Sequence, residues 1–380
     1  MTITDLKTSI AHWLRDFNQP LFQNLEGNTD ISVSQRDSRD DTFDVLKGIA
    51  IILMILGHCN VGPLHGFIFT FHMPLFFFVT GYFLKIRPLH IEIGMSLKRL
   101  IVPYVFSVFC ILIFISIQDF ANKGWLDTLY IKDVSLRFLL GFKGGSAPEW
   151  LHGEIRALWF FLALFWARAI IVFLINTIKS VPVLCIIVLM LSLLGAFCGE
   201  HFFVPFCIPL GISATGFIYA GFLIRKYNLL KSAKITTFFP VLLILWLYSW
   251  IRGGINIAFF HYPIGYVFGL LGAFGAFYSL YKFVQCFFNK ESIFWKFILW
   301  GGRFSIVIYC FHAIDENTIK WKILAHHLHI SFEYFDFFQI ISRLTITFFI
   351  AFMALKIKPI QKYIFQNTAK TSSSPKHSHF

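Results

Sequence analysis

Two residues with complementary chemistry, Lys47 and His58, stand eleven positions apart in the first long apolar run of the chain. Eleven residues of α-helix turn through about 1100° and rise about 16 Å, so the two side chains lie within about 20° of one face. Asp44 falls about 40° to the other side of this stripe. A cation at one end and a titratable imidazole farther along suit a long ligand with an anionic head and a distant reactive end.

The composition places this run in a membrane. Of the 380 residues, 57% are hydrophobic and only 14% are charged, against about 25% charged in an ordinary soluble domain. These values exclude a soluble enzyme, a disordered chain and a disulfide scaffold, and the seven cysteines read as small residues of a membrane core. The net charge of +13 is then explained by orientation in the membrane, and we expect no nucleic-acid partner.

Ten apolar runs are long enough to cross about 30 Å of hydrocarbon. They predict an all-α fold, a polytopic integral membrane bundle of about ten transmembrane helices. We expect a polar N-terminal segment (1–42) without a cleavable signal peptide, a membrane domain (43–356) and a polar C-terminal tail (357–380). The predicted spans are 44–62, 66–84, 100–118, 156–176, 181–198, 204–224, 236–251, 263–284, 293–313 and 337–355.

The basic residues give these spans a direction. With the N-terminus inside, 22 of the 33 Lys and Arg residues fall in inner segments and 8 in outer ones. This asymmetry follows the positive-inside rule and predicts that both termini are cytoplasmic. Lys47 then lies near the cytoplasmic boundary, and His58 lies in the outer half of the bilayer.

Polar groups at membrane depth are costly and therefore candidates for function. His72 in the second span and His312 in the ninth reach a depth similar to that of His58, and Pro74 is expected to open the helix ladder beside His72. We expect no metal site, because no two of these histidines have the i, i+3 or i, i+4 spacing of helical ligands. Arg303, near the middle of a span, is expected to line a cavity or to pair internally.

Simpler roles remain open for several of these residues. Lys47 could extend its amine to the membrane surface, and His58 could form an interhelical hydrogen bond. Asp315 and Glu316, or Glu149 and Glu154, could orient a histidine, but the sequence favours a solvated loop for each of them. A transporter or flippase for a glycolipid or small anion also suits ten spans with intramembrane cations, although no internal repeat supports it.

Five ordered stretches resemble the integral-membrane acyltransferase 3 family of bacteria. Two of them depart from the family pattern, with Lys47 where many members have arginine and Thr80 where serine is usual. No acidic residue follows the Trp159 motif, and in this respect the sequence resembles the branch of short sugar O-acetyltransferases. The stretches are Asp44–Ala50 ending in Gly57-His58, Phe71–Phe77 through Gly81-Tyr82, Lys98–Tyr104, Leu158–Leu162, and Gly301–Ser305 with Tyr309–His312.

The resemblance implies an O-acetyltransferase of the bacterial cytoplasmic membrane, with residues 43–356 as its acyltransferase domain. It implies acetyl-CoA as the acyl donor, with no permanently bound cofactor, and a sugar hydroxyl of a surface polysaccharide or its lipid-linked precursor as the acceptor. His58 would be the catalytic residue, acting either as a general base or as an acyl-carrying nucleophile. Lys47, Arg39, Lys98 and Arg99 would bind the donor phosphates, and Asp44, His72, Trp159, Arg303, Ser305 and His312 would line the active site.

Overall fold

A computed structural model describes residues 40–143, 148–151 and 153–365. Within these ranges the chain is helical and has no strand; one isolated bridge joins Asn256 and His261. The predicted all-α class is therefore confirmed. Most of the expected N-terminal segment and the end of the expected C-terminal tail lie outside the described residues.

Each of the ten predicted spans coincides with a helix or with consecutive helices. The elements are α3 (Asp41–Gly57), α4 (Leu64–Phe69), α5 (His72–Tyr82), α6 (Leu89–Ser96), η1 (Leu97–Ile101), α7 (Val102–Lys123), α8 (Thr128–Leu140), η2 (Arg156–Leu158), α9 (Trp159–Thr177), α10 (Val181–His201), α11 (Ile208–Lys226), η3 (Leu229–Lys231), α12 (Ala233–Ile251), η4 (Ile257–Phe259), α13 (Tyr266–Phe287), α14 (Ile293–Arg303), α15 (Ser305–Thr318), α16 (Trp321–His327), α17 (Phe332–Lys356) and η5 (Ile360–Ile364).

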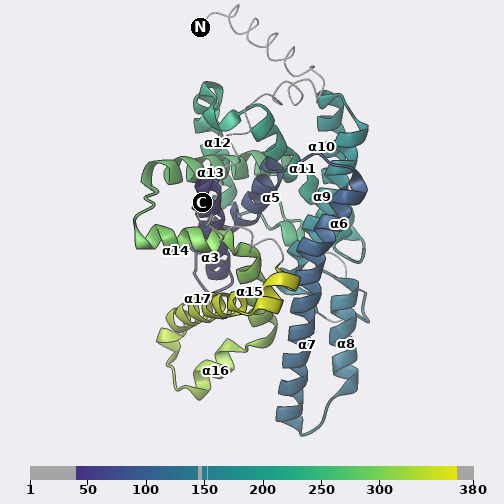
Figure 1. Ribbon diagram of the computed structural model, residues 1–380, viewed down its shortest axis with the longest axis vertical. Coiled ribbons are helices and arrows are strands. Elements are labelled where there is room, and N and C mark those ends of the chain that lie inside the picture. Colours follow the sequence, from purple (N-terminus) through teal and green to yellow (C-terminus); the bar gives the residue numbers. More distant parts are fainter. Residues whose placement is uncertain (1–39, 144–147, 152, 366–380) are drawn as a thin grey trace, which may run out of the picture.

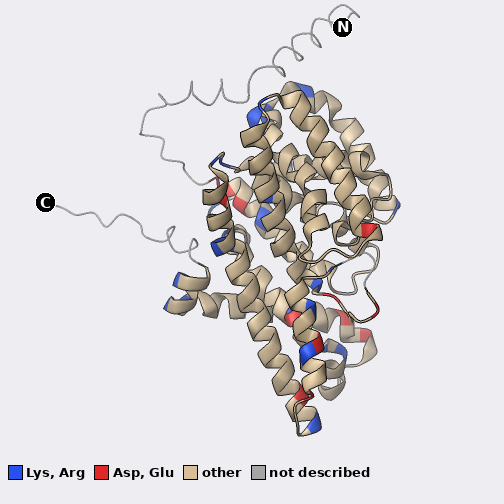
Figure 2. Cartoon of the chain, turned by 90° about the vertical axis from the view of Figure 1, so that its right-hand side faces the viewer, with Lys and Arg blue, Asp and Glu red and all other residues tan. Residues whose placement is uncertain are grey.

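In the described ranges, eight helical segments are long and apolar enough to cross a membrane, and the bent pair α14–α15 makes a ninth. The first predicted span corresponds to α3, which has 17 residues. The chain is thus a multi-pass membrane protein with a helix-bundle fold. Figure 2 shows how sparse charged residues are along the described helices.

Three spans differ in detail from the straight helices that hydropathy predicts. The ninth bends by 78° between Arg303 and Ser305, where two glycines and a serine weaken the helix. The second changes direction before His72 rather than at Pro74, which lies in the first turn of α5. The third is 35 residues long with its flanking helices, about 52 Å at 1.5 Å per residue, and therefore exceeds the thickness of the hydrocarbon.

Helices α7 and α8 run side by side away from the rest of the bundle, at the lower end of Figure 1, and α9, α10 and α11 pack together at the upper end. The segment between the third and fourth predicted spans contains α8. The capping residue of this helix, Asp127, accepts a hydrogen bond from the Tyr130 amide. Helix α17 packs against α15, and α16 packs against α17. Consequently the ends of α3, α8, α15 and α17 are available to form one site.

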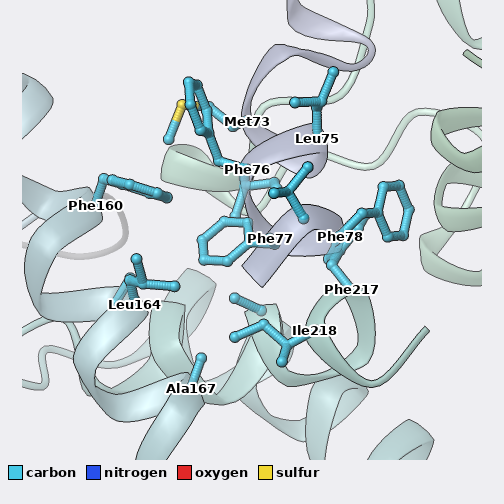
Figure 3. Close-up of a cluster of buried hydrophobic side chains, with 14 of the residues drawn as sticks. Met73, Leu75, Phe76, Phe77, Phe78, Phe160, Leu164, Ala167, Phe217 and Ile218 are labelled. Atoms are coloured by element: carbon cyan, nitrogen blue, oxygen red, sulfur yellow. The ribbon is translucent and has the colours of Figure 1, made fainter. Parts of the chain in front are cut away.

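The core is built around α5, whose side chains are almost all buried. Phe77 and Phe78 are fully buried, and their rings contact Phe160 of α9 and Phe217 of α11 at centroid distances of 5.2 and 5.8 Å (Figure 3). Such aromatic contacts add to the dispersion energy that holds helices together in lipid. Helix α5 thereby fixes His72 at its first position.

Helices α3 and α14 cross in backbone contact at two glycines. A Cβ atom on Gly302 would lie 1.6 Å from the carbonyl oxygen of Asp44, and one on Gly48 would lie 2.0 Å from that of Ile298. Small residues permit this close approach between membrane helices. The crossing brings Arg303, the last residue of α14, beside the first turns of α3.

We therefore expect Gly302→Ala to destabilise the folded protein by about 1–3 kcal/mol, because the added methyl group must separate two backbones. The measurement is the thermal unfolding midpoint of the purified full chain in detergent. Gly94→Ala is the control, since a Cβ there meets open space. Equal midpoints for the two variants would refute the close crossing.

Candidate active site

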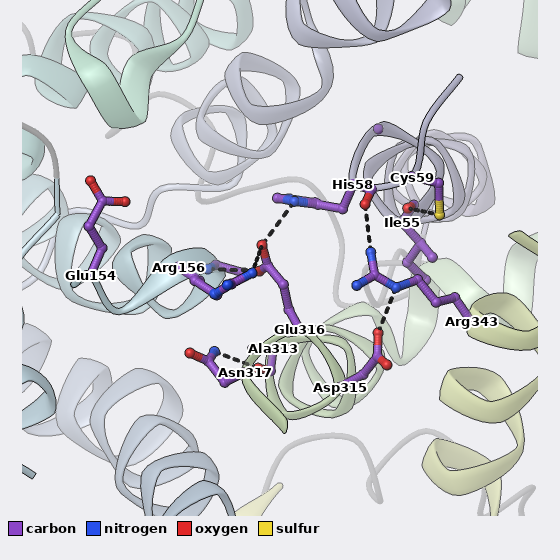
Figure 4. A network of polar contacts seen from close by, with 12 residues as sticks. Ile55, His58, Cys59, Glu154, Arg156, Ala313, Asp315, Glu316, Asn317 and Arg343 are labelled. Carbon is purple, nitrogen blue, oxygen red and sulfur yellow. Dashed lines mark hydrogen bonds and ion pairs between the residues drawn. The ribbon is translucent and has the colours of Figure 1, made fainter. Parts of the chain in front are cut away.

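His58 ends helix α3 and faces a carboxylate from α15. Its Nδ1 lies 3.2 Å from Oε1 of Glu316, and the two side chains are 26% and 10% exposed. An ionised carboxylate only accepts hydrogen bonds, so this contact places the proton of a neutral imidazole on Nδ1 and leaves Nε2 as a base. Figure 4 shows His58 and Arg156 directed toward Glu316 from two sides.

Arg343 of α17 holds the backbone of His58 in place. Its Nη1 donates a hydrogen bond of 2.6 Å to the His58 carbonyl oxygen, and its Nε lies 3.1 Å from Oδ2 of Asp315. Asp315 also accepts a hydrogen bond from the indole of Trp321 at 2.8 Å. Arg343 thus connects the end of α3 to α15 and α17 (Figure 4).

His312, one turn before Glu316 on α15, is fully buried beside His58. The two rings are 5.0 Å apart between centroids, and neither nitrogen of His312 has a hydrogen-bond partner among the described atoms. Ligand atoms of His58, His312 and Glu316 lie within 4.8 Å of one another, a group that could hold a metal ion. The expectation of no metal site considered only the spacing between histidines. It did not include Glu316, which lies four residues after His312 on the same helix.

His72 is buried at the start of α5, and its Nδ1 contacts the Ile68 carbonyl oxygen at 2.8 Å. It borders the same cavity as His58, a space of about 300 Å³. Trp159, the buried first residue of α9, also lines this cavity. The sequence predicted only a similar depth for the three histidines; the structure makes His58 and His312 neighbours and places His72 on the lining of the same cavity as His58.

A second cavity of about 730 Å³ lies on the other side of Glu316, between α8, α15, α16 and α17. Arg156 and Glu316 line both cavities. Arg156 has a positive φ of 46°, which is uncommon for a residue other than glycine, and its Nη1 lies 3.9 Å from Oε1 of Glu316. The histidine–carboxylate pair thus stands where two spaces meet.

The opposite end of α3 carries a cluster of charges. Lys47 pairs with Asp44 at 2.7 Å, and Arg303 pairs with Asp41 at 2.8 Å and lies 3.7 Å from Asp44. Lys290 also contacts Asp41, at 3.0 Å. The expected internal pairing of Arg303 is therefore observed, and three cations share two carboxylates.

The remaining predicted site residues lie elsewhere. Lys98 and Arg99 are exposed on η1, beside the buried pair that Glu92 forms with Arg168 at 2.6 Å. Ser305 is buried at the first position of α15. Arg39 falls outside the described residues.

Comparison with known proteins gives the family of this chain. The family model described as an acyltransferase domain, that of the acyltransferase 3 family, matches residues 40–356. This chain belongs to the acyltransferase 3 family. It is therefore a membrane transferase of acyl groups.

A short segment is also similar to the nodulation protein NolL of Sinorhizobium fredii, with 41% identity over 58 residues. The match covers 12% of this chain and 16% of that protein. No solved structure matches the chain. The family assignment thus rests on the long match to the family model.

Sequence reasoning assigned the wrong environment to two residues of this acyltransferase. Asp315 and Glu316 were expected in a solvated loop, but α15 continues to Thr318 and both side chains are largely buried. Arg343 was not predicted as a site residue either. Its only sequence signal is a guanidinium inside an apolar run, which is costly unless it is paired.

We expect Arg343→Gln to lower the kcat of acyl transfer by about tenfold or more, because the His58 carbonyl loses its donor and Asp315 its cation. Arg343→Lys keeps the charge and should recover part of the rate, and the donor KM should change little in both. Rates and unfolding midpoints are measured on the purified full chain, with Arg252→Gln, at an exposed position, as the control. Full activity of both Arg343 variants would exclude a positioning role.

Proposed function

We propose that this acyltransferase moves an acetyl group from cytoplasmic acetyl-CoA to a sugar hydroxyl of a surface polysaccharide or its lipid-linked precursor, in the bacterial cytoplasmic membrane. The observation that carries the proposal is the contact between His58 and Glu316 at the junction of two cavities. One cavity can receive the thioester, and the other can receive the acceptor.

Glu316 supports a general-base role for His58. With the Nδ1 proton directed at the carboxylate, Nε2 takes the proton of the attacking hydroxyl, and the carboxylate stabilises the imidazolium that forms. The hydroxyl oxygen bonds to the thioester carbonyl carbon, the carbon–sulfur bond breaks, and the imidazolium returns its proton to the departing CoA thiolate. Acyl transfer then needs no covalent intermediate on the enzyme.

The charges at the other end of α3 support a donor site there. Lys47 lies eleven residues before His58 on one helix, about 16 Å along its axis. With Lys290 and Arg303 it supplies three cations beside the carboxylates of Asp41 and Asp44, and such cations can bind the phosphates of CoA. The pantetheine arm would then extend along α3 toward His58.

We expect His58→Ala to lower acetyl transfer by about 10²–10⁴-fold and Glu316→Gln to lower it by a smaller factor, since the first removes the base and the second only its partner. Mass spectrometry of the surface polysaccharide and CoA release by the purified chain measure the effect. His201→Ala, at an exposed histidine of α10, is the control.

Two results would contradict this mechanism. Wild-type acetylation by His58→Ala would remove the catalytic assignment. An acetyl-histidine at position 58, trapped by acid quenching with acetyl-CoA and no acceptor, would replace the general base by a nucleophile.

For the donor cluster, we expect Lys47→Ala to raise the KM for acetyl-CoA about tenfold, because a charge-assisted hydrogen bond to phosphate is lost. Lys47→Arg keeps the cation and should raise it far less. Lys296→Ala, an exposed lysine of α14, serves as the control in the same steady-state assay. Equal KM values for the Ala and Arg variants at position 47 would argue against a phosphate contact.

A further inference from the structure

The larger cavity beside Glu316 carries an excess of positive charge. Its lining includes the cations Arg137, Arg156, Lys320, Lys322 and Arg343 and the carboxylates Glu316 and Asp336. Arg343 is occupied by Asp315 and the His58 carbonyl, and Asp336 accepts a hydrogen bond of 2.9 Å from Asn60. Of the two carboxylates that line the cavity, this leaves Glu316 for the other four cations, and Arg137 has Asp133 of its own helix as a further acidic neighbour.

Arg137 is the cation whose surroundings point most directly to a ligand. It lies on α8, its Nε is buried, and that nitrogen has no hydrogen-bond partner within the described part of the chain. No described carboxylate lies within 4.0 Å of its guanidinium. A partly buried guanidinium that forms no ion pair is costly, because it loses hydration and the charge of Asp133 compensates it only from a distance.

The backbone opposite Arg137 leaves room for its side chain. A Cβ atom on Gly153 would lie 2.6 Å from Nη1 of Arg137, and Gly153 has a φ of +81°, which favours glycine. The segment that follows leads directly to Arg156, which reaches Glu316 only at 3.9 Å. Such a weak pair can exchange its partner for a stronger anion. Arg137 and Arg156 thus form two donors on the cavity side of the catalytic pair.

We propose that this cavity binds a negatively charged group of the acceptor, so that the acceptor is an anionic carbohydrate bearing a carboxylate or a phosphate. The proposal rests on the proposed function and names its acceptor class. Arg137 and Arg156 bind the anion, Lys320 and Lys322 attract it at the exposed mouth, and the sugar hydroxyl lies toward Glu316 and His58. Guanidinium groups suit this role because they bind carboxylate and phosphate with two parallel hydrogen bonds.

The test measures binding separately from catalysis. Purified full chain in detergent is heated with D-glucuronate, D-glucose 6-phosphate, D-glucose or inorganic phosphate at equal ionic strength. A ligand that binds only the folded state raises the unfolding midpoint. We expect one or both anionic sugars to raise it at concentrations at least tenfold below those needed for glucose.

Arg137→Gln should remove this difference between anionic and neutral sugars, and Arg137→Lys should keep part of it. Lys132→Gln is the matched control, because Lys132 lies on the same helix but borders a separate apolar groove. Equal protection by glucose, or full protection of Arg137→Gln, would overturn the anion site. Protection by inorganic phosphate equal to that by glucose 6-phosphate would overturn the assignment to a carbohydrate.

A second assay separates this proposal from the proposed function. The anionic sugars should stimulate CoA release from acetyl-CoA at least tenfold more than glucose does, and the stimulation should disappear in His58→Ala. Stimulation that survives His58→Ala would refute the catalytic role while the binding result stands. Binding without preference for anions, together with His58-dependent release, would refute only the anionic acceptor.

Discussion

The buried ion pair of Arg343 with Asp315 is the interaction on which the arrangement of the site depends. A guanidinium at membrane depth must find its partners within the protein, and here these are a carboxylate of α15 and the backbone carbonyl at the end of α3. The same two helices supply Glu316 and His58, so the pairing that satisfies Arg343 also brings the proposed base and its carboxylate together. One set of contacts thus both compensates the charge of Arg343 and positions the proposed catalytic pair.

Much of the architecture was predictable because each span must be apolar on its own. Hydropathy predicted helices at all ten positions, and eight described segments and the bent pair α14–α15 are long and apolar enough to cross a membrane. The spacing of Lys47 and His58 was also informative, since Lys47 lies within α3 and His58 is the residue that caps its C-terminal end. Its position near the middle of a predicted span also made Arg303 noteworthy, although the 78° bend after it was not anticipated. These features depend on short stretches of sequence and can be predicted without knowledge of the tertiary structure.

The partners within the site could not be predicted in this way. Glu316 follows His312 in a polar stretch, and its sequence does not distinguish the last turn of a helix from a loop. Its burial comes from α3 and from η2, which are far away in the sequence. Likewise, nothing near Arg343 indicates that its guanidinium reaches the carbonyl of His58, 285 positions earlier. The depth of a residue in the membrane can be predicted from its own span, whereas its neighbours on other helices cannot.

The backbone crossing at Gly48 and Gly302 has a consequence for the proposed donor. The crossing fixes one end of α3 against α14, and Arg343 fixes the other end. A helix held at both ends keeps the cation at position 47 and the imidazole at position 58 at a fixed separation. The enzyme would thus select its acyl donor by the distance between the phosphates and the thioester. A carrier with a shorter arm would bind at position 47, but its thioester would not reach position 58.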